Sequence, residues 1–317
     1  MSFMYKPAIL LTLILTILSL DIFPQACCTV GTSISSGVER SVIKHKKLSA
    51  AFSFQNNILN NTYQTTTEID DPLNRKSSVS DFTLELEYGL AERVSVLVLG
   101  GYTNKSRTTT FTDPGINSSE EITFTGNGFT DIVILGKYEI VVPDIVLPLG
   151  ASIGAGAKLP TGSYTLEENG TRLSIDLQPG TGASDLLLWG HINYAFPILS
   201  IAINANALYR YTGTNIDNYR YGDEVLASVN GTYSIADFLA LNLQLRGRYA
   251  DRDYWDRRFL PSTGGTYIDL TPSLIYVEGN FNLRILAQLP LYRNVEGIQL
   301  TVSEKLGAEM RYLFDLN

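Results

Sequence analysis

Cysteine, charge and long apolar runs are all scarce in this chain of 317 residues. The two cysteines, Cys27 and Cys28, are adjacent, so no disulfide framework can span the fold. Charged residues make up 18% of the sequence, which is low for a soluble protein of this length. The net charge is −8 and there is no basic run, which argues against a nucleic-acid partner.

The amino terminus has the parts of a secretory signal peptide. Lys6 precedes an apolar run from Ala8 to Leu20. Small residues follow at Ala26 and Cys27. The run is shorter than the roughly 20 apolar residues that a membrane-spanning helix needs. We therefore expect residues 1–26 to be a signal peptide that is removed.

The position of Cys27 raises the possibility of a lipid anchor. It directly follows Ala26, as in a lipoprotein signal, where the thiol receives a diacylglyceryl group. However, Pro24 stands where such a signal takes leucine. The favoured interpretation is an incidental cysteine pair, with lipidation of Cys27 as the alternative.

Beyond residue 26 no stretch is apolar for long enough to form a transmembrane helix, and alternating segments recur instead. In "LALNLQLRGRY", residues 239–249, four leucines share one parity and polar residues hold most of the other. This period of two indicates a strand, either in a soluble sandwich or in a barrel surrounded by lipid. About twelve such segments, each near the 9 to 11 residues that cross a bilayer, have one uncharged face. A closed barrel is the β-structure that leaves no backbone group unpaired in lipid.

Tyrosines and connections distinguish the barrel from the sandwich. Tyr88, Tyr138 and Tyr249 end alternating segments, as in the aromatic girdles of outer-membrane barrels. Short turns are predicted at 89–92, 141–144, 195–197, 235–238 and 277–280. Long polar loops are predicted at 56–77, 104–126, 160–181, 212–222, 251–264 and 293–298. Short and long connections that alternate in this way are typical of outer-membrane barrels.

The sequence therefore predicts an all-β fold, a transmembrane antiparallel up-and-down β-barrel of about 12 strands. The barrel is expected to span residues 47–314 in the bacterial outer membrane, with both termini periplasmic. Residues 27–46 lack clear periodicity and are predicted to be a periplasmic lead-in segment, with folding into the barrel mouth as one alternative.

Five strand-and-turn phrases stand out: "EYGLAERVSV" (87–96), "DIVILGKYEI" (131–140), "GAGAKLPTGS" (154–163), "LPSTGGTYIDLTPSLIY" (260–276) and "LAQLPLYRNVEGIQL" (286–300). In this order they resemble the outer-membrane transporter family named for the meta-cleavage pathway of phenol degradation, over roughly residues 80 to 314. The resemblance implies a transmembrane barrel that passes small hydrophobic or aromatic compounds. No site residues are carried over, and the first two long loops depart from the family in detail.

The inward parity is predicted to line the pore with charged and polar side chains. They are Glu85, Glu87, Asp131, Lys137, Asp185, Trp189, His191, Arg246, Arg248, Asp269, Arg284, Glu309 and Arg311. One hypothesis is a polar pathway whose charges select solutes. The favoured alternative is a ladder of ion pairs that fills a narrow lumen, because charges inside a barrel need partners or water. Both can hold at different heights.

Several inward positions are apolar. They are Leu97, Leu99, Leu135, Leu187, Trp189 and Leu226. This patch could escort an apolar solute. The favoured alternative is packing against the lead-in segment or an infolded loop. This apolar patch is stronger evidence for a hydrophobic cargo than the charged residues are.

His191 is the one histidine expected on a strand and raises the question of an outer-membrane hydrolase. A hydrolase needs a nucleophile, a base and an orienting group within hydrogen-bond reach. Ser184 and Asp185 are near in sequence, but Ser184 would face lipid if Asp185 and His191 face inward. We therefore expect the protein not to be an enzyme.

The predicted function is a passive channel or facilitator for small, hydrophobic or aromatic molecules. A structural or adhesive barrel with partner-binding loops is the main alternative. Expected partners are outer-membrane lipid, lipopolysaccharide and a small-molecule solute, with no nucleic acid. The glycine-rich stretch 150–162 lacks the Gly-Lys-Ser/Thr ending of a phosphate-binding loop, and no cofactor or metal is predicted.

Overall fold

The structure, a computed structural model, describes residues 39–71, 73–113 and 118–316. The predicted signal peptide and most of the predicted lead-in segment lie outside these residues. Over the described ranges, no helix has the length and apolar character needed to cross a membrane.

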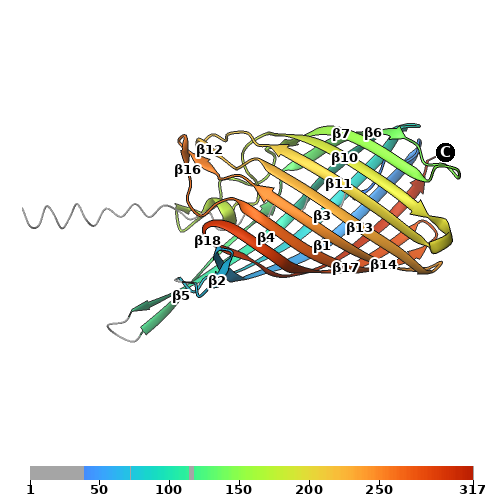
Figure 1. Cartoon of the computed structure of the whole chain (residues 1–317). Helices are drawn as coiled ribbons and strands as arrows, with labels where there is room; N and C mark the ends of the chain where they lie inside the picture. The colour runs from blue at the N-terminus through green and yellow to red at the C-terminus, as the bar shows by residue number, and fades with distance from the viewer. Residues whose placement is uncertain (1–38, 72, 114–117, 317) are drawn as a thin grey trace, which may run out of the picture.

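Within the described residues, eleven strand elements form the wall of a closed antiparallel barrel (Figure 1). They are β1 (Lys47–Thr65), β3 (Lys76–Ala91), β4 (Val94–Asp113), β6 (Ile132–Val141), β7 (Leu149–Leu159), β10 (Asp185–Phe196), β11 (Ile201–Tyr211), β13 (Glu224–Ala236), β14 (Leu239–Ala250), β17 (Gly265–Glu278) and β18 (Phe281–Asp315). Each strand pairs with the next one in this order, and β18 closes the barrel by pairing with β1.

The last element, β18, crosses the wall twice. Its first part pairs with β17, from Phe281 opposite Glu278 to Val295 opposite Gly265. Its second part pairs with β1, from Val295 opposite Thr65 to Asp315 opposite Lys47. Val295 thus lies at one end of the barrel, whereas Phe281 and Asp315 lie at the other end. The chain therefore reverses after Val295, where Gly297 has a positive φ of 69°. The eleven described elements therefore make twelve passes, as the alternating segments predict.

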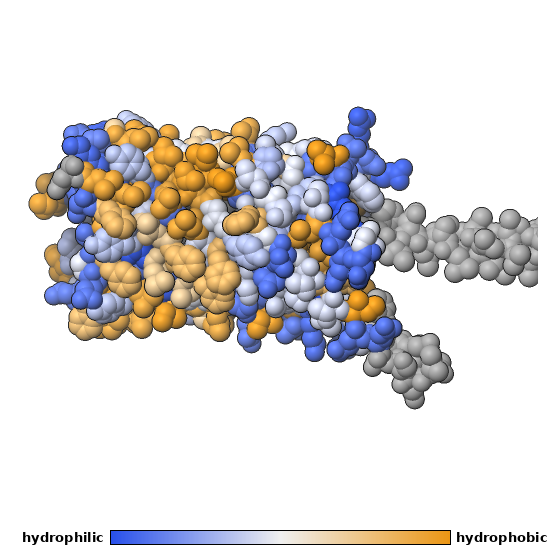
Figure 2. Space-filling model, turned by 180° about the vertical axis from the view of Figure 1, so that it is seen from behind, coloured by the Kyte–Doolittle hydropathy of each residue, from blue (hydrophilic) through white to orange (hydrophobic). Residues whose placement is uncertain are grey.

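The predicted parity is confirmed along the wall. In β14, Leu243 is 54% exposed on the outer face, whereas the side chain of Gln244 points inward and is 3% exposed. Figure 2 shows that apolar residues cover the half of the barrel nearer the short turns, and that polar residues increase towards the long connections. This apolar band surrounding a polar interior is the arrangement of a transmembrane β-barrel.

Three predicted long loops are wrong in part, because strands continue through them. β1 runs to Thr65 across predicted loop 56–77, and predicted loop 293–298 lies within β18. Predicted loop 104–126 contains the end of β4 and the start of β5 (Ser118–Phe129), which form a hairpin that projects from the barrel (Figure 1). Segments 56–77 and 104–126 are polar but rich in threonine and serine, and threonine is itself enriched in strands.

The two ends of the barrel differ in the length of their connections. At the short-turn end, β3 and β4 are joined at Glu92 and Arg93, and Lys47 of β1 pairs with Asp315 of β18. At the other end, connections 160–184, 212–223 and 251–264 fold over the mouth. They contain β8 (Glu167–Glu168), β9 (Thr171–Arg172), the 3-10 helix η2 (Ile175–Leu177), β12 (Tyr219–Arg220), β15 (Tyr254–Trp255) and β16 (Arg258–Phe259). We call this end the capped end.

Candidate functional site inside the barrel

The structure places all thirteen predicted pore-lining residues on the inner face of the barrel. Ten are buried: Glu85, Glu87, Asp131, Lys137, Asp185, Trp189, His191, Asp269, Glu309 and Arg311. Arg246, Arg248 and Arg284 are partly buried. That they line a path for solute remains a prediction.

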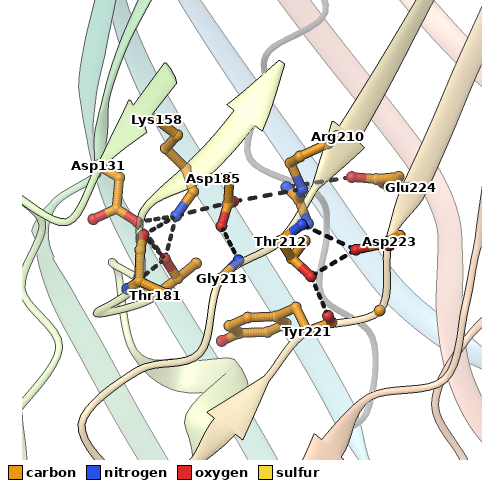
Figure 3. Close-up of polar contacts among 12 residues, drawn as sticks. Asp131, Lys158, Thr181, Asp185, Arg210, Thr212, Gly213, Tyr221, Asp223 and Glu224 are labelled. Atoms are coloured by element: carbon orange, nitrogen blue, oxygen red, sulfur yellow. Dashed lines mark hydrogen bonds and ion pairs between the residues drawn. The ribbon is translucent and has the colours of Figure 1, made fainter. Parts of the chain in front are cut away.

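A belt of alternating charges crosses the interior near the capped end (Figure 3). Lys158 Nζ lies 2.8 Å from an Asp131 oxygen and 3.2 Å from an Asp185 oxygen. Arg210 continues the belt from Asp185, at 3.7 Å, to Glu224, at 3.3 Å. Glu224 also pairs with Arg248 of the next strand, β14. The belt thus runs from the residue before β6 across five neighbouring strands of the wall, β7 to β14, and neutralises its own charges.

The belt also anchors two of the capping connections. Thr181 donates its backbone N–H and its hydroxyl to Asp131, at 2.9 and 2.6 Å. Lys158 Nζ donates to the carbonyl oxygen of Ala183, and Asp185 accepts a hydrogen bond from the backbone of Gly213. Connection 160–184 is therefore tied to the barrel interior, as an infolded loop.

Arg210 and Lys105 are inward cations of this region that the sequence candidates do not include. Arg210 follows the outward Tyr209, so the parity of β11 contains the signal that could have found it. Lys105 of β4 lies in a predicted loop and donates to the carbonyl oxygens of Asp176 and Gln178, at 3.1 and 2.8 Å. No local pattern predicts that contact, because the two partners lie more than seventy residues further along the chain.

An apolar cluster lies below the belt, towards the short-turn end. Its members are Leu97, Leu99, Val133, Leu135, Leu187, Trp189, Leu208 and Leu226. They come from β4, β6, β10, β11 and β13, and each is at most 9% exposed. The cluster includes all six apolar residues that the sequence places inside.

One glycine of β7 makes room for the ring of Trp189. Gly154 pairs with Trp189 across the sheet, and a Cβ at Gly154 would lie 3.0 Å from Trp189 Cε3. The indole stacks on the imidazole of His191, with ring centroids 5.7 Å apart. Lys137 Nζ lies 5.0 Å from the indole centroid, within the range of a cation–π contact.

Ion pairs hold the start of the described chain inside the barrel. Arg40 contacts Glu309 at 2.6 Å, and Glu39 contacts Arg284 at 3.2 Å. Lys137 Nζ bridges the Glu87 carboxylate and the Arg40 carbonyl, each at 3.1 Å. Residues 39–41 of the lead-in segment therefore occupy part of the interior.

Arg311 and Glu85 extend these ion pairs around the wall. Arg311 Nη2 lies 2.8 Å from Glu85 and 3.3 Å from Glu309. Nearer the capped end, Asp269 of β17 pairs with Arg293 of β18. The favoured sequence hypothesis, a ladder of ion pairs in the interior, thus describes most of the predicted charged residues.

The hydrolase alternative fails on geometry. Ser184 is exposed on the outer side, whereas Asp185 and His191 are buried inside. Asp185 is already engaged by Lys158 and Arg210. The serine therefore lies on the opposite side of the wall from the histidine that would have to activate it.

Comparisons with known proteins identify the fold. No family model matches the sequence, and no curated protein matches it. An outer-membrane channel from Pseudomonas putida F1 has a TM-score of 0.64 at 11% identity, covering 86% of this chain and 97% of that chain. The NanC porin gives a TM-score of 0.43 at 9% identity, covering 84% and 98% of the two chains. The CymD monoaromatic hydrocarbon channel gives 0.40 at 8% identity, covering 86% and 89%. The first likeness shows that this chain has the fold of an outer-membrane barrel.

Proposed function

We propose that the protein is a passive channel or facilitator for small hydrophobic or aromatic molecules in the bacterial outer membrane. The observation that carries the proposal is the apolar cluster around Trp189. Interiors of transmembrane barrels are polar, so a buried apolar cluster built from five strands is suited to an apolar solute that displaces its side chains. The sequence resemblance to the phenol meta-cleavage family points to the same class of cargo.

The charged belt favours neutral solutes over ions. Its carboxylates and cations are paired, so an ion would have to separate buried pairs, which costs several kcal/mol when one partner is left alone. A neutral molecule has to displace side chains only. Diffusion through the barrel therefore requires movement of the infolded loop and of residues 39–41, without energy coupling inside the chain.

The proposal includes an orientation of the barrel in the outer membrane. With the short-turn end at the periplasm, both termini are periplasmic, and the capped end faces the lipopolysaccharide leaflet and the medium. Lipopolysaccharide is itself the barrier that makes such a protein useful, because its charged sugar layer excludes apolar molecules that would otherwise enter the bilayer unaided.

The test is entry of N-phenyl-1-naphthylamine into cells with intact lipopolysaccharide, where this apolar dye becomes fluorescent in membrane interiors. Cells that make the protein should take up the dye severalfold faster than cells without it. Leu187→Asn, inside the apolar cluster, should remove most of that gain, because the amide has more hydrogen-bonding groups than the single N–H of the dye can satisfy.

Leu300→Asn is the matched control. Leu300 is also buried and apolar, but it packs with Leu59 and Val79 in a separate cluster on β1, β3 and β18. Both variants should be folded by heat-modifiability on gels, and the control should keep its dye uptake. Equal uptake with and without the wild-type protein would overturn the proposal. It would leave an adhesive role, for which the projecting hairpin of β4 and β5 offers a surface.

A further inference from the structure

The capping connections form a partly open cavity of about 550 Å³, none of whose lining residues belongs to the apolar cluster in the barrel. Its walls come from all three connections, 160–184, 212–223 and 251–264. This volume lies within the range of small-molecule sites, roughly 300 to 1,000 Å³. We call it the vestibule.

Aromatic and aliphatic side chains supply most of its surface. They are Tyr164, Leu173, Ile175, Tyr219, Trp255 and Leu260. Leu260 and Tyr219 are buried, form a cluster with Tyr221, and have Ile175 packed against them. Trp255 lines the vestibule, and its side chain is 40% exposed. A ligand in the vestibule would therefore cover apolar surface that the protein leaves uncovered.

Two tyrosines of the vestibule have their hydroxyl groups engaged by carboxylates. The hydroxyl of Tyr164 donates to Asp217 at 2.6 Å, and Arg172 pairs with Asp217 at 2.9 Å while it lies over the Tyr164 ring. The hydroxyl of Tyr219 donates to Asp253. Burial, together with these carboxylates, raises the pKa of both phenols, so each tyrosine stays neutral.

The side-chain amide of Gln178 fixes the chain that carries Leu173. Its oxygen accepts from the backbone of Leu166 at 3.0 Å, and its nitrogen donates to the carbonyl oxygens of Leu166 and Leu173. Lys105 of β4 donates a hydrogen bond to the carbonyl oxygen of Gln178. The vestibule is thus formed in advance of any ligand, which lowers the ordering cost of binding.

The vestibule adjoins the belt. The ring of Tyr221 packs on that of Tyr219, with centroids 5.0 Å apart. Tyr221 also lines a small space shared with Arg210 and Arg248. A molecule that leaves the vestibule on this side therefore meets the charged belt next.

We propose that the vestibule is a capture site for a neutral aromatic molecule of one or two rings, which it concentrates before entry into the barrel. The inference rests on the proposed channel function for its role, but not for binding itself. Three aromatic residues from three connections favour a flat ligand, because aromatic pairs gain about 0.5–1.5 kcal/mol beyond the area they bury.

The two tryptophans of the chain make the test specific. Trp189→Phe leaves Trp255 as the reporter of the vestibule, and Trp255→Phe leaves Trp189 as the reporter of the barrel interior. Nitrobenzene is the probe, since it is neutral, aromatic and quenches indole fluorescence. 1-Nitrohexane carries the same quenching group without a ring.

In the purified Trp189→Phe protein, nitrobenzene should quench Trp255 with a saturable curve, and 1-nitrohexane should quench it only in proportion to concentration. Adding Ile175→Asp should raise the half-saturating concentration about tenfold or more. Ile216→Asp is the matched control, because Ile216 lies in the same cap but is 81% exposed outside the vestibule, and it should change nothing.

Ser174→Phe tests whether Ile175→Asp acts only by misfolding the cap. This second variant fills the vestibule with a ring and places no charge in it. It should weaken nitrobenzene binding as well. Linear quenching of Trp255 by nitrobenzene, equal affinity for 1-nitrohexane, or equal effects of Ile175→Asp and Ile216→Asp would each overturn the inference.

Dye uptake by cells separates the two proposals. Protein-dependent uptake without saturable quenching of Trp255 would remove the capture site and leave the channel. Saturable quenching without uptake would keep the capture site and remove the channel.

Discussion

At the scale of single residues, Lys158 has the most demanding position in the barrel. Its side chain is fully buried and lies between two carboxylates, those of Asp131 and Asp185. It also donates to Thr181 and to the carbonyl of Ala183. One ammonium group therefore balances the belt and holds the infolded loop.

Lys158→Met should lower the free energy of unfolding by about 3–5 kcal/mol, because it leaves buried carboxylates without their cation. Denaturant unfolding in lipid vesicles, followed by tryptophan fluorescence, measures this. Proteolysis within connection 160–184 should also become faster. Lys76→Met, at an exposed lysine of β3, is the control and should be neutral. Equal stability of the two variants would show that the belt does not hold the loop.

At the scale of the strands, glycine determines how closely β6 and β7 approach. A Cβ at Gly156 would lie 2.2 Å from the Ile134 carbonyl oxygen and 2.8 Å from Leu135 Cα. These are backbone atoms that cannot turn aside as a side chain can. By contrast, Gly231 of β13 has open space where its Cβ would be.

Gly156→Ala should therefore destabilise the barrel by about 1–3 kcal/mol, the usual cost of forcing extra volume into a packed site. Gly231→Ala should be neutral or slightly stabilising, because alanine loses less backbone entropy than glycine. The unfolding midpoints of the two variants provide the comparison. Equal midpoints would contradict the close approach of β6 and β7.

The period of two in the sequence predicted the twelve crossings of the wall and which side chains point inward or outward. This works because the face of each residue depends only on its neighbours in the strand. Leu243 and Gln244 could be placed in this way. The ends of the strands could not be predicted in this way, because pairing beyond the apolar band depends on the partner strand, as in β4 and β5. The Lys105 contacts and the place of residues 39–41 depend on segments distant in sequence.

At the scale of the whole molecule, the barrel combines an apolar outside with an interior that is divided by height. The cap and its vestibule come first, then the charged belt, then the apolar cluster, then the ion pairs that include Glu39 and Arg40. The central claim beneath all of this is that the outer parity contacts lipid tails and the inner parity does not.

Single tryptophans on neighbouring positions of β14 test that claim. In a chain that carries Trp189→Phe and Trp255→Phe, Leu243→Trp and Gln244→Trp are reconstituted in vesicles of lipids brominated along their acyl chains. Bromine should strongly quench the tryptophan at 243 and leave the one at 244 nearly unchanged. Equal quenching at both positions, or quenching at neither, would contradict a barrel whose outer parity lies in lipid.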